Sequence, residues 1–248
     1  MGTYLLRRAK VKGHEAPVDI HIKGDRIAKI SPTEEDAGPA GAEAIEVGGR
    51  LVIPGFVDAH MHLEKGMVSD RRLNRSGTLE EGLEIMMEVK KGFTVEDIHR
   101  RARKQIEMAV SNGSTSLRTH IDLDSAIGLK GVEALSALRE DLKELVTIQL
   151  VVLPHGDPVS SQEFLKVLRK AIELSDLIGG FPGPGDEKLV DLLFQLAREF
   201  DRDLDLHVDE KDDTETLEIR YVAEKTIQEG YEGRVTVDHL CALSSLPS

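Results

Sequence analysis

The sequence contains 248 residues, 40% of them hydrophobic and 31% charged, and its 32 basic and 45 acidic side chains give a formal net charge of −13 at pH 7. This length accommodates one large α/β domain or a barrel with a small accessory domain, and an acidic surface repels phosphate backbones and anionic membranes, so we expect no nucleic-acid or membrane partner. With one cysteine, Cys241, and no run near the about 18 apolar residues that a membrane span needs, the sequence favours a cytoplasmic protein without disulfide bonds.

The first 53 residues are predicted to form short β-strands. In residues 19–23, polar and apolar side chains alternate, which is typical of a half-buried antiparallel strand. Residues 32–41, rich in proline, glycine, alanine and acidic residues, predict a surface loop. The β-like runs are residues 4–11, 18–30 and 44–53. We assign residues 1–53 to part of a small β-sandwich.

From residue 51 onward, short apolar runs alternate with helical segments. Capping-box patterns that mark two helix starts pair Thr78 with Glu81 and Thr94 with Asp97. Strands that alternate with helices indicate parallel βαβ units, of which a closed (β/α)8 barrel needs eight. Six strands are predicted, over residues 51–59, 114–121, 145–153, 177–181, 204–208 and 234–239. We expect an α/β fold in which residues 54–248 form a partial (β/α)8 TIM-type barrel of about six βα units.

The strongest chemical signal is a pair of histidines, His60 and His62, at the end of the first of these strands. Alternate side chains of a strand share a face, so both imidazoles would lie side by side at the C-terminal mouth of a barrel, as two metal ligands do. An isolated pair of this kind can also be one packed and one solvated histidine. This pair, however, ends an apolar strand that Pro54-Gly55 introduces, and further histidines end other strands. We therefore predict two metal ligands.

A third histidine, His207, ends the fifth strand and would supply a third nitrogen ligand. Glu210 follows in the next loop, where its carboxylate can swing over a metal-bound water. A hydrolytic metal site needs an open coordination position and a carboxylate that moves protons. An acidic surface run is the alternative for this segment, but it does not explain a histidine at the end of an apolar strand.

Three more histidines end predicted strands, each with two candidate roles. His239, at the sixth strand, would be a metal ligand or would orient the hydroxide and polarise the substrate. His120, at the second strand, fits a structural and a functional role equally well. His155, directly after the third strand, fits a structural role or the rim of a substrate pocket, and we place it at the rim.

These residues lie in segments that resemble the cytosine deaminase-like branch of the amidohydrolase superfamily. Residues 54–65, PGFVDAHMHLEK, resemble its PGFVDxHxHLDK opening, and residues 118–122, RTHID, resemble its RTHVD. Residues 149–154 are similar to its QIVAFP, residues 207–213 to its HCDExDD, and residues 234–239 to its RVTxSH. The motifs keep the order and spacing of the branch across essentially the whole chain, so they are specific for the branch and less so for a substrate.

The resemblance implies a β-sandwich and a distorted (β/α)8 barrel that holds one divalent metal ion, zinc or iron. The residues that match its functional positions are the metal ligands His60, His62 and His207, the proton shuttle Glu210 and the hydroxide-orienting His239. Binuclear relatives carry a lysine at the end of the fourth strand, and its absence from residues 181–185, FPGPG, favours one ion. The implied reaction is hydrolysis of a C–N bond in a small cyclic amidine or amide by metal-bound hydroxide.

The resemblance also bears on the substrate. His155, Gln149 and His120 fall within or directly beside the matching motifs, and we expect them on the substrate side of the site. At the position of His155 the branch has a glutamine that hydrogen-bonds a pyrimidine. An imidazole cannot offer the paired donor and acceptor of an amide to a ring edge, which argues against cytosine itself.

The last metal ligand of the branch, an aspartate at the end of the eighth strand, has no counterpart in residues 1–248. A second hypothesis is therefore a truncated, catalytically inactive barrel fragment. Six parallel strands leave two sheet edges open for pairing, so we expect a homo-oligomer or completion by a missing C-terminal segment. The metal content of the purified chain would distinguish an assembled site from an inactive fragment.

Overall fold

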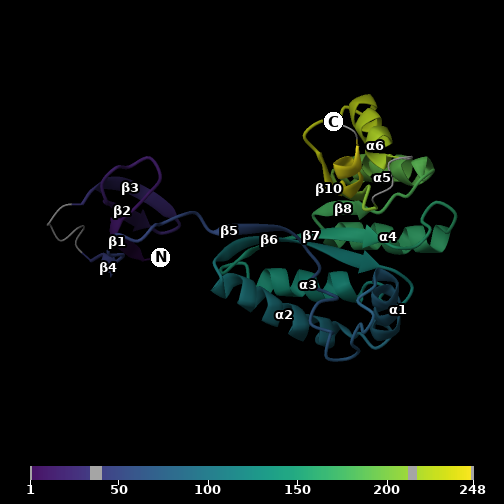
Figure 1. Cartoon of the computed structure of the whole chain (residues 1–248), viewed down its shortest axis with the longest axis horizontal. Helices are drawn as coiled ribbons and strands as arrows, with labels where there is room; N and C mark the ends of the chain where they lie inside the picture. The colour runs from purple at the N-terminus through teal and green to yellow at the C-terminus, as the bar shows by residue number, and fades with distance from the viewer. Residues whose placement is uncertain (1, 34–40, 212–216, 247–248) are drawn as a thin grey trace. The chain divides into compact units, whose positions relative to one another are not determined.

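The computed structural model describes three segments of the chain, residues 2–33, 41–211 and 217–246. Most of the predicted surface loop, residues 34–40, lies outside them. The chain divides into two compact units, Met1–Gly55 and Phe56–Ser248. Figure 1 shows strands in the first unit and alternating strands and helices in the second.

The first unit is built on one four-stranded sheet. Its strands are β1 (Thr3–Ala9), β2 (Val18–Lys23), β3 (Arg26–Pro32) and β4 (Glu43–Glu46), in the order β3-β2-β1-β4. Strand β2 pairs antiparallel with β1 and β3, whereas β4 lies parallel to β1. A small core forms around Ala9, Val18 and Ile20. Where the sequence predicted part of a β-sandwich, the described residues of this unit form a single sheet.

The second unit contains a six-stranded parallel sheet that curls into a half-barrel, which confirms the predicted partial (β/α)8 fold. The strands are β5 (Phe56–Met61), β6 (Ser114–Leu123), β7 (Thr147–Pro154), β8 (Leu177–Gly180), β9 (Asp203–Val208) and β10 (Val235–His239). They lie in the order β10-β9-β8-β7-β6-β5, so each strand pairs with its neighbours along the chain. The curl is strong enough that His60 on β5 hydrogen-bonds Asp238 on β10.

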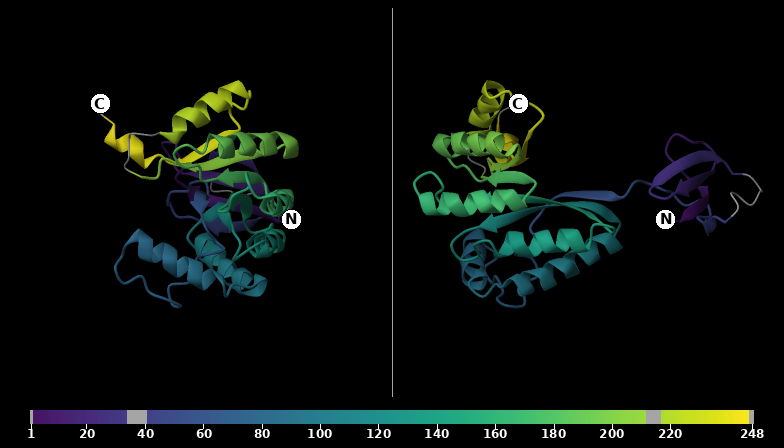
Figure 2. Two further views of the ribbon diagram at one scale, coloured as in Figure 1. Left: turned by 90° about the vertical axis from the view of Figure 1, so that its right-hand side faces the viewer. Right: turned by 180° about the vertical axis from the view of Figure 1, so that it is seen from behind.

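Helices connect these strands and cover one face of the sheet (Figure 2). They are α1 (Leu79–Lys90), α2 (Val95–Ser111), α3 (Lys130–Asp141), α4 (Gln162–Leu174), α5 (Glu187–Phe200), α6 (Glu218–Gln228) and the short 3-10 helix η1 (Cys241–Ser245). Thr78 and Thr94 cap α1 and α2 through their hydroxyls, as the capping-box patterns predicted. None of the helices in the described segments has the length and apolar character to cross a membrane.

The alternation of side chains along each strand separates the core from the site. On β9, Leu204, Leu206 and Val208 belong to the large buried core that the sheet forms with its helices. Asp205 and His207 alternate with these apolar residues, so they face the concave side of the sheet. The helices therefore fix the strands from one side and leave polar residues at their C-terminal ends on the other.

Candidate metal centre

Five of the predicted histidines gather at the C-terminal ends of the parallel strands. His60 and His120 lie on β5 and β6, His207 lies on β9, His239 ends β10, and His62 directly follows β5. The carboxyl ends of parallel strands meet at one mouth of the barrel. The fold therefore brings together residues that are up to 179 positions apart in the sequence.

The rings of the three predicted ligands lie close to one another. The ring centroids of His60 and His207 lie 4.7 Å apart, those of His60 and His62 lie 5.3 Å apart, and those of His62 and His207 lie 5.8 Å apart. Imidazoles that share a tetrahedral ion through bonds of about 2.0–2.1 Å have ring centroids roughly 5 Å apart. The three rings are thus neighbours, although the ligand atoms of His62 lie close to those of Glu64 and Asp122 and form a second candidate group with them.

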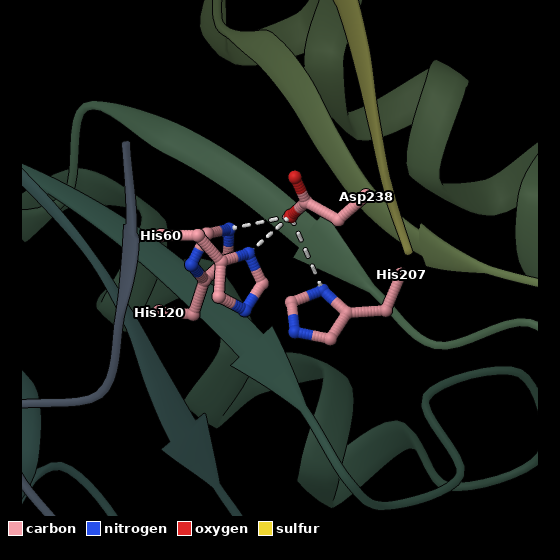
Figure 3. Close-up of side chains that lie close together, drawn as sticks. All are labelled: His60, His120, His207 and Asp238. Atoms are coloured by element: carbon pink, nitrogen blue, oxygen red, sulfur yellow. Dashed lines mark hydrogen bonds and ion pairs between the residues drawn. The ribbon is translucent and has the colours of Figure 1, made fainter. Parts of the chain in front are cut away.

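A carboxylate that the sequence analysis did not select, Asp238, lies among these rings (Figure 3). Its Oδ2 atom is 2.9 Å from Nδ1 of His60, 3.2 Å from Nε2 of His120 and 3.7 Å from Nδ1 of His207. One potential ligand atom from each of these four residues lies within 4.8 Å of the others. His62 stands beside this group, and its Nδ1 donates to the backbone oxygen of His120 at 3.0 Å, which leaves Nε2 available.

The free nitrogens of the site fit a divalent ion. Both ring nitrogens of His207 and Nδ1 of His120 are buried and have no hydrogen-bond partner in the described part of the chain. Burial, and then the charges of neighbouring histidines, lower the pKa of His207 to about 3, while burial and then the charge of Lys65 lower the pKa of His62 to about 3. Both imidazoles are therefore neutral near pH 7, as ligands must be, and imidazole with carboxylate suits zinc or iron.

A polar network on the concave side of the sheet links the buried His120 to the exposed Gln149. His120 is fully buried, and its Nε2 donates to Asp205 at 3.1 Å. Burial lowers the pKa of His120, but hydrogen bonds to Asp205 and Asp238 outweigh this effect and raise it to about 9. Arg118 donates to Asp205 at 2.6 Å and to Gln149 at 3.0 Å. Both predicted substrate residues thus lie in a layer that supports the site.

A second polar cluster forms around Asp122. This carboxylate accepts hydrogen bonds from His155 at 3.0 Å, Lys65 at 2.9 Å and Lys90. Burial raises the pKa of Asp122, yet the hydrogen bond from His155 and the lysine charges hold it well below its usual range. Burial and the charge of Asp122 raise the pKa of the fully buried Glu64 to about 7. The cluster holds the exposed ring of His155 through its Nε2 atom.

A cavity of about 140 Å³ lies beside the histidines and is lined in part by His207, Glu210 and Phe181. The ring of Phe181 lies 6.4 Å from that of His155 and is nearly parallel to it. Nε2 of His239 lies 3.0 Å from Oε1 of Glu210, and both side chains are partly exposed. The structure thus places the predicted proton shuttle, its histidine partner and a ring-lined hollow next to the candidate ligands.

The backbone at the strand ends is strained where these side chains emerge. His239 and Leu240, at the end of β10, have φ angles of 70° and 54°, and Asp209, after β9, has a φ angle of 52°. Non-glycine residues rarely adopt such left-handed conformations, and those that do cluster at functional sites. The left-handed backbone at His239 interrupts the regular alternation of side chains along β10, and its ring lies beside Glu210.

Sequence reasoning missed Asp238 and Asp205, of which alternation along the strand pointed only to Asp205. Asp205 lies two residues before His207 on β9, and Asp238 lies opposite His207 in the register of β9 and β10. Residues two apart in a strand share a face. Every polar residue two positions from a predicted histidine was therefore a candidate for the concave side.

Comparison with known proteins gives one family. A family model described as "Amidohydrolase family" matches residues 51–248. An N-isopropylammelide isopropyl amidohydrolase from Pseudomonas sp. (strain ADP) is 34% identical over 98% of this chain and 62% of its own length. A pterin deaminase from Rhizobium rhizogenes is 30% identical over 91% of this chain and 52% of its own length.

A solved structure shows the same architecture. The crystal structure of a 5-methylcytosine deaminase from Klebsiella pneumoniae with 5-fluorocytosine aligns with a TM-score of 0.87 and 31% identity. The alignment covers 98% of this chain and 60% of that enzyme. The chain thus spans about three fifths or less of the length of these relatives.

Proposed function

The chain belongs to the amidohydrolase family, and from this premise we propose that it hydrolyses a C–N bond of a small cyclic amidine or amide with one divalent ion, zinc or iron. His60, His62 and His207 hold the ion. The observation that carries the proposal is the clustering of these three rings, with centroids 4.7–5.8 Å apart, together with the two buried nitrogens of His207 that have no partner in the described segments.

The chain supplies the proton transfers of this reaction through Glu210 and His239. A bound divalent ion supplies Lewis-acid activation of the attacking water. Glu210 accepts a proton from this water and delivers it to the departing nitrogen, while His239, 3.0 Å away, orients the carboxylate and stabilises charge on the ring. Water adds to the ring carbon, the C–N bond breaks, and ammonia or an amine leaves with the transferred proton.

The substrate that this site supports best is a nitrogen heterocycle. The names of the relatives refer to N-isopropylammelide, pterin and 5-methylcytosine, all of which are such rings. Phe181 lines the cavity, and the ring of His155 lies 6.4 Å from it at an interplanar angle of 30°; aromatic faces of this kind favour stacking with a planar ring. His120 and Gln149 act on the substrate through the layer that they support, since His120 is fully buried and Gln149 bonds Arg118.

Metal analysis and a substrate screen test the proposal together. We expect about one zinc or iron ion per chain after purification without chelator, and release of ammonia or an amine from at least one cyclic amidine or amide. A folded chain that takes up no ion, even after reconstitution, would contradict the metal centre. Uptake of the ion without turnover of any ring would favour the alternative hypothesis of a catalytically inactive fragment.

A further inference from the structure

We propose that Asp238 is a carboxylate ligand of this metal centre, so that the half-barrel itself supplies three imidazoles and one carboxylate to the ion and leaves a fifth position open for water. The inference rests on the proposed metal-dependent function. It adds a ligand from β10 to those on and after β5 and on β9. In the motif RVTxSH of the resembling branch, serine stands at the position of Asp238.

The distances around Asp238 match those between ligands of one ion. Ligand atoms about 2.0–2.1 Å from a tetrahedral ion lie about 3.3 Å from one another. Oδ2 of Asp238 lies 2.9 Å from Nδ1 of His60 and 3.7 Å from Nδ1 of His207, so the two distances bracket this value. In the parallel register Asp238 is the direct partner of His207, so the sheet itself fixes the pair.

Hydrogen bonds alone do not account for this arrangement. Nδ1 of His207 is buried and faces the carboxylate, yet 3.7 Å is too long for a hydrogen bond. Its Nε2 is buried as well and has no partner in the described segments. Buried polar atoms without partners are rare in folded proteins and call for a specific cause. An ion between His207 and Asp238 would provide a partner for the Nδ1 atom that faces the carboxylate and for the carboxylate itself.

His120 completes the arrangement as a positioning residue. Its ring is stacked on that of His60 at 4.3 Å with an interplanar angle of 29°, closer than the roughly 5 Å between two imidazoles that share one tetrahedral ion. Its Nε2 donates toward Asp205 and Asp238, at 3.1 and 3.2 Å. Ligating carboxylates are commonly held by such outer hydrogen bonds. His120 therefore orients Asp238, which joins His60 and His207 as a ligand, and His62, outside the group of four with close ligand atoms, would approach the ion from beside them.

The test measures metal binding directly. Zinc affinity of the whole chain is measured by competition with a chromophoric chelator, and the cobalt(II)-loaded protein is examined by visible absorption. We expect Asp238→Ser, which restores the serine of the branch, to lower zinc affinity more than about 100-fold, beyond the about 10–100-fold cost of losing an outer partner. We also expect the cobalt spectrum to change, because one ligand is replaced by water.

Three further variants separate the outcomes. Asp238→Asn keeps the size of the side chain but removes its charge, and it provides the test if the serine variant does not fold by circular dichroism. Asp203→Asn, at the outer end of β9 in a surface pair with Arg234, is the matched carboxylate control. If wild type and Asp238→Ser bind zinc alike, with the same cobalt spectrum, while His207→Ala does not bind, only this inference is overturned. If wild type binds no ion, the proposed function itself fails.

Discussion

Glu210 lies 3.0 Å from His239 beside the candidate metal centre, and the proposed function makes it the carrier of a proton from the attacking water to the leaving nitrogen. We expect Glu210→Gln to lower kcat by about 100-fold or more, because general acid–base catalysis contributes about 10²–10⁴-fold. Glutamine keeps the size of the side chain, so the metal content should stay the same. Steady-state assays and metal analysis of one preparation check both expectations, with Glu163→Gln in the first turn of α4 as control. A loss of less than about tenfold would remove Glu210 from the role of proton carrier.

Glu64 gives the molecule a distinct pH dependence at the residue scale. Its pKa of about 7 in the folded protein is higher than its ordinary value of 4.5. The stability that follows from this shift is fully present below about pH 4.5 and is lost as the pH rises through about 7. Glutamine at this position stays neutral. We therefore expect the free energy of unfolding of wild type to fall, relative to that of Glu64→Gln, by on the order of 2 kcal/mol as the pH rises from 5 to 8.

Urea unfolding of both proteins at pH 5 and pH 8 measures this difference. Glu163→Gln, on an exposed position of α4, is again the control and should follow wild type at both pH values. Parallel stability curves for wild type and Glu64→Gln across this range would show that Glu64 is ionised in the folded protein near pH 7.

At the scale of single elements, β8 is held close to its neighbour by a glycine. A Cβ atom on Gly179 would lie 2.9 Å from the backbone oxygen of Val152 on β7, and this oxygen cannot move without disturbing the sheet. We expect Gly179→Ala to destabilise the protein by about 1–3 kcal/mol, the usual cost of overpacking. Thermal or urea unfolding measures the effect. Gly183→Ala is the control, because its Cβ would meet only Asp186 at 3.5 Å; equal stability of the two variants would contradict the expectation.

Local patterns predicted the elements of the half-barrel well. The fifth apolar run, predicted over residues 204–208, became β9 (Asp203–Val208), and Thr94 caps α2 as expected. The parallel pairing of β4 with β1 could not be predicted, because alternation within a strand does not specify a partner distant in sequence.

The same distinction applies to the candidate site. His60, a histidine at the end of an apolar strand, stands out in the sequence, and the structure places it at the mouth of the half-barrel. An aspartate in a strand has the appearance of a surface residue. The inward position of Asp238 became evident only from its register with His207.

At the scale of the whole molecule, the two edge strands of the half-barrel are places where a second copy, or a further segment of the same protein, can pair. In the described segments, β5 pairs only with β6, and Phe56 and Val57 on this edge strand are 55% and 70% exposed. Unpaired, apolar strand edges favour pairing with another chain. We expect concentration-dependent association of two copies through β5, and Val57→Lys to weaken it about tenfold or more, because an edge lysine opposes pairing. Sedimentation velocity measures both, and a wild-type chain that stays monomeric across the concentration series would contradict the expectation.

The hydrogen bond between His60 and Asp238 joins residues 178 positions apart. On a ribosome, the histidines of β5 therefore emerge long before the strand that completes their surroundings, and contacts of such sequence separation form slowly. The helices and the first strand pairs can form earlier from local contacts. Ion capture is thus expected to mark the last step of folding rather than to nucleate it, and a newly made chain would acquire its metal only once its architecture is in place.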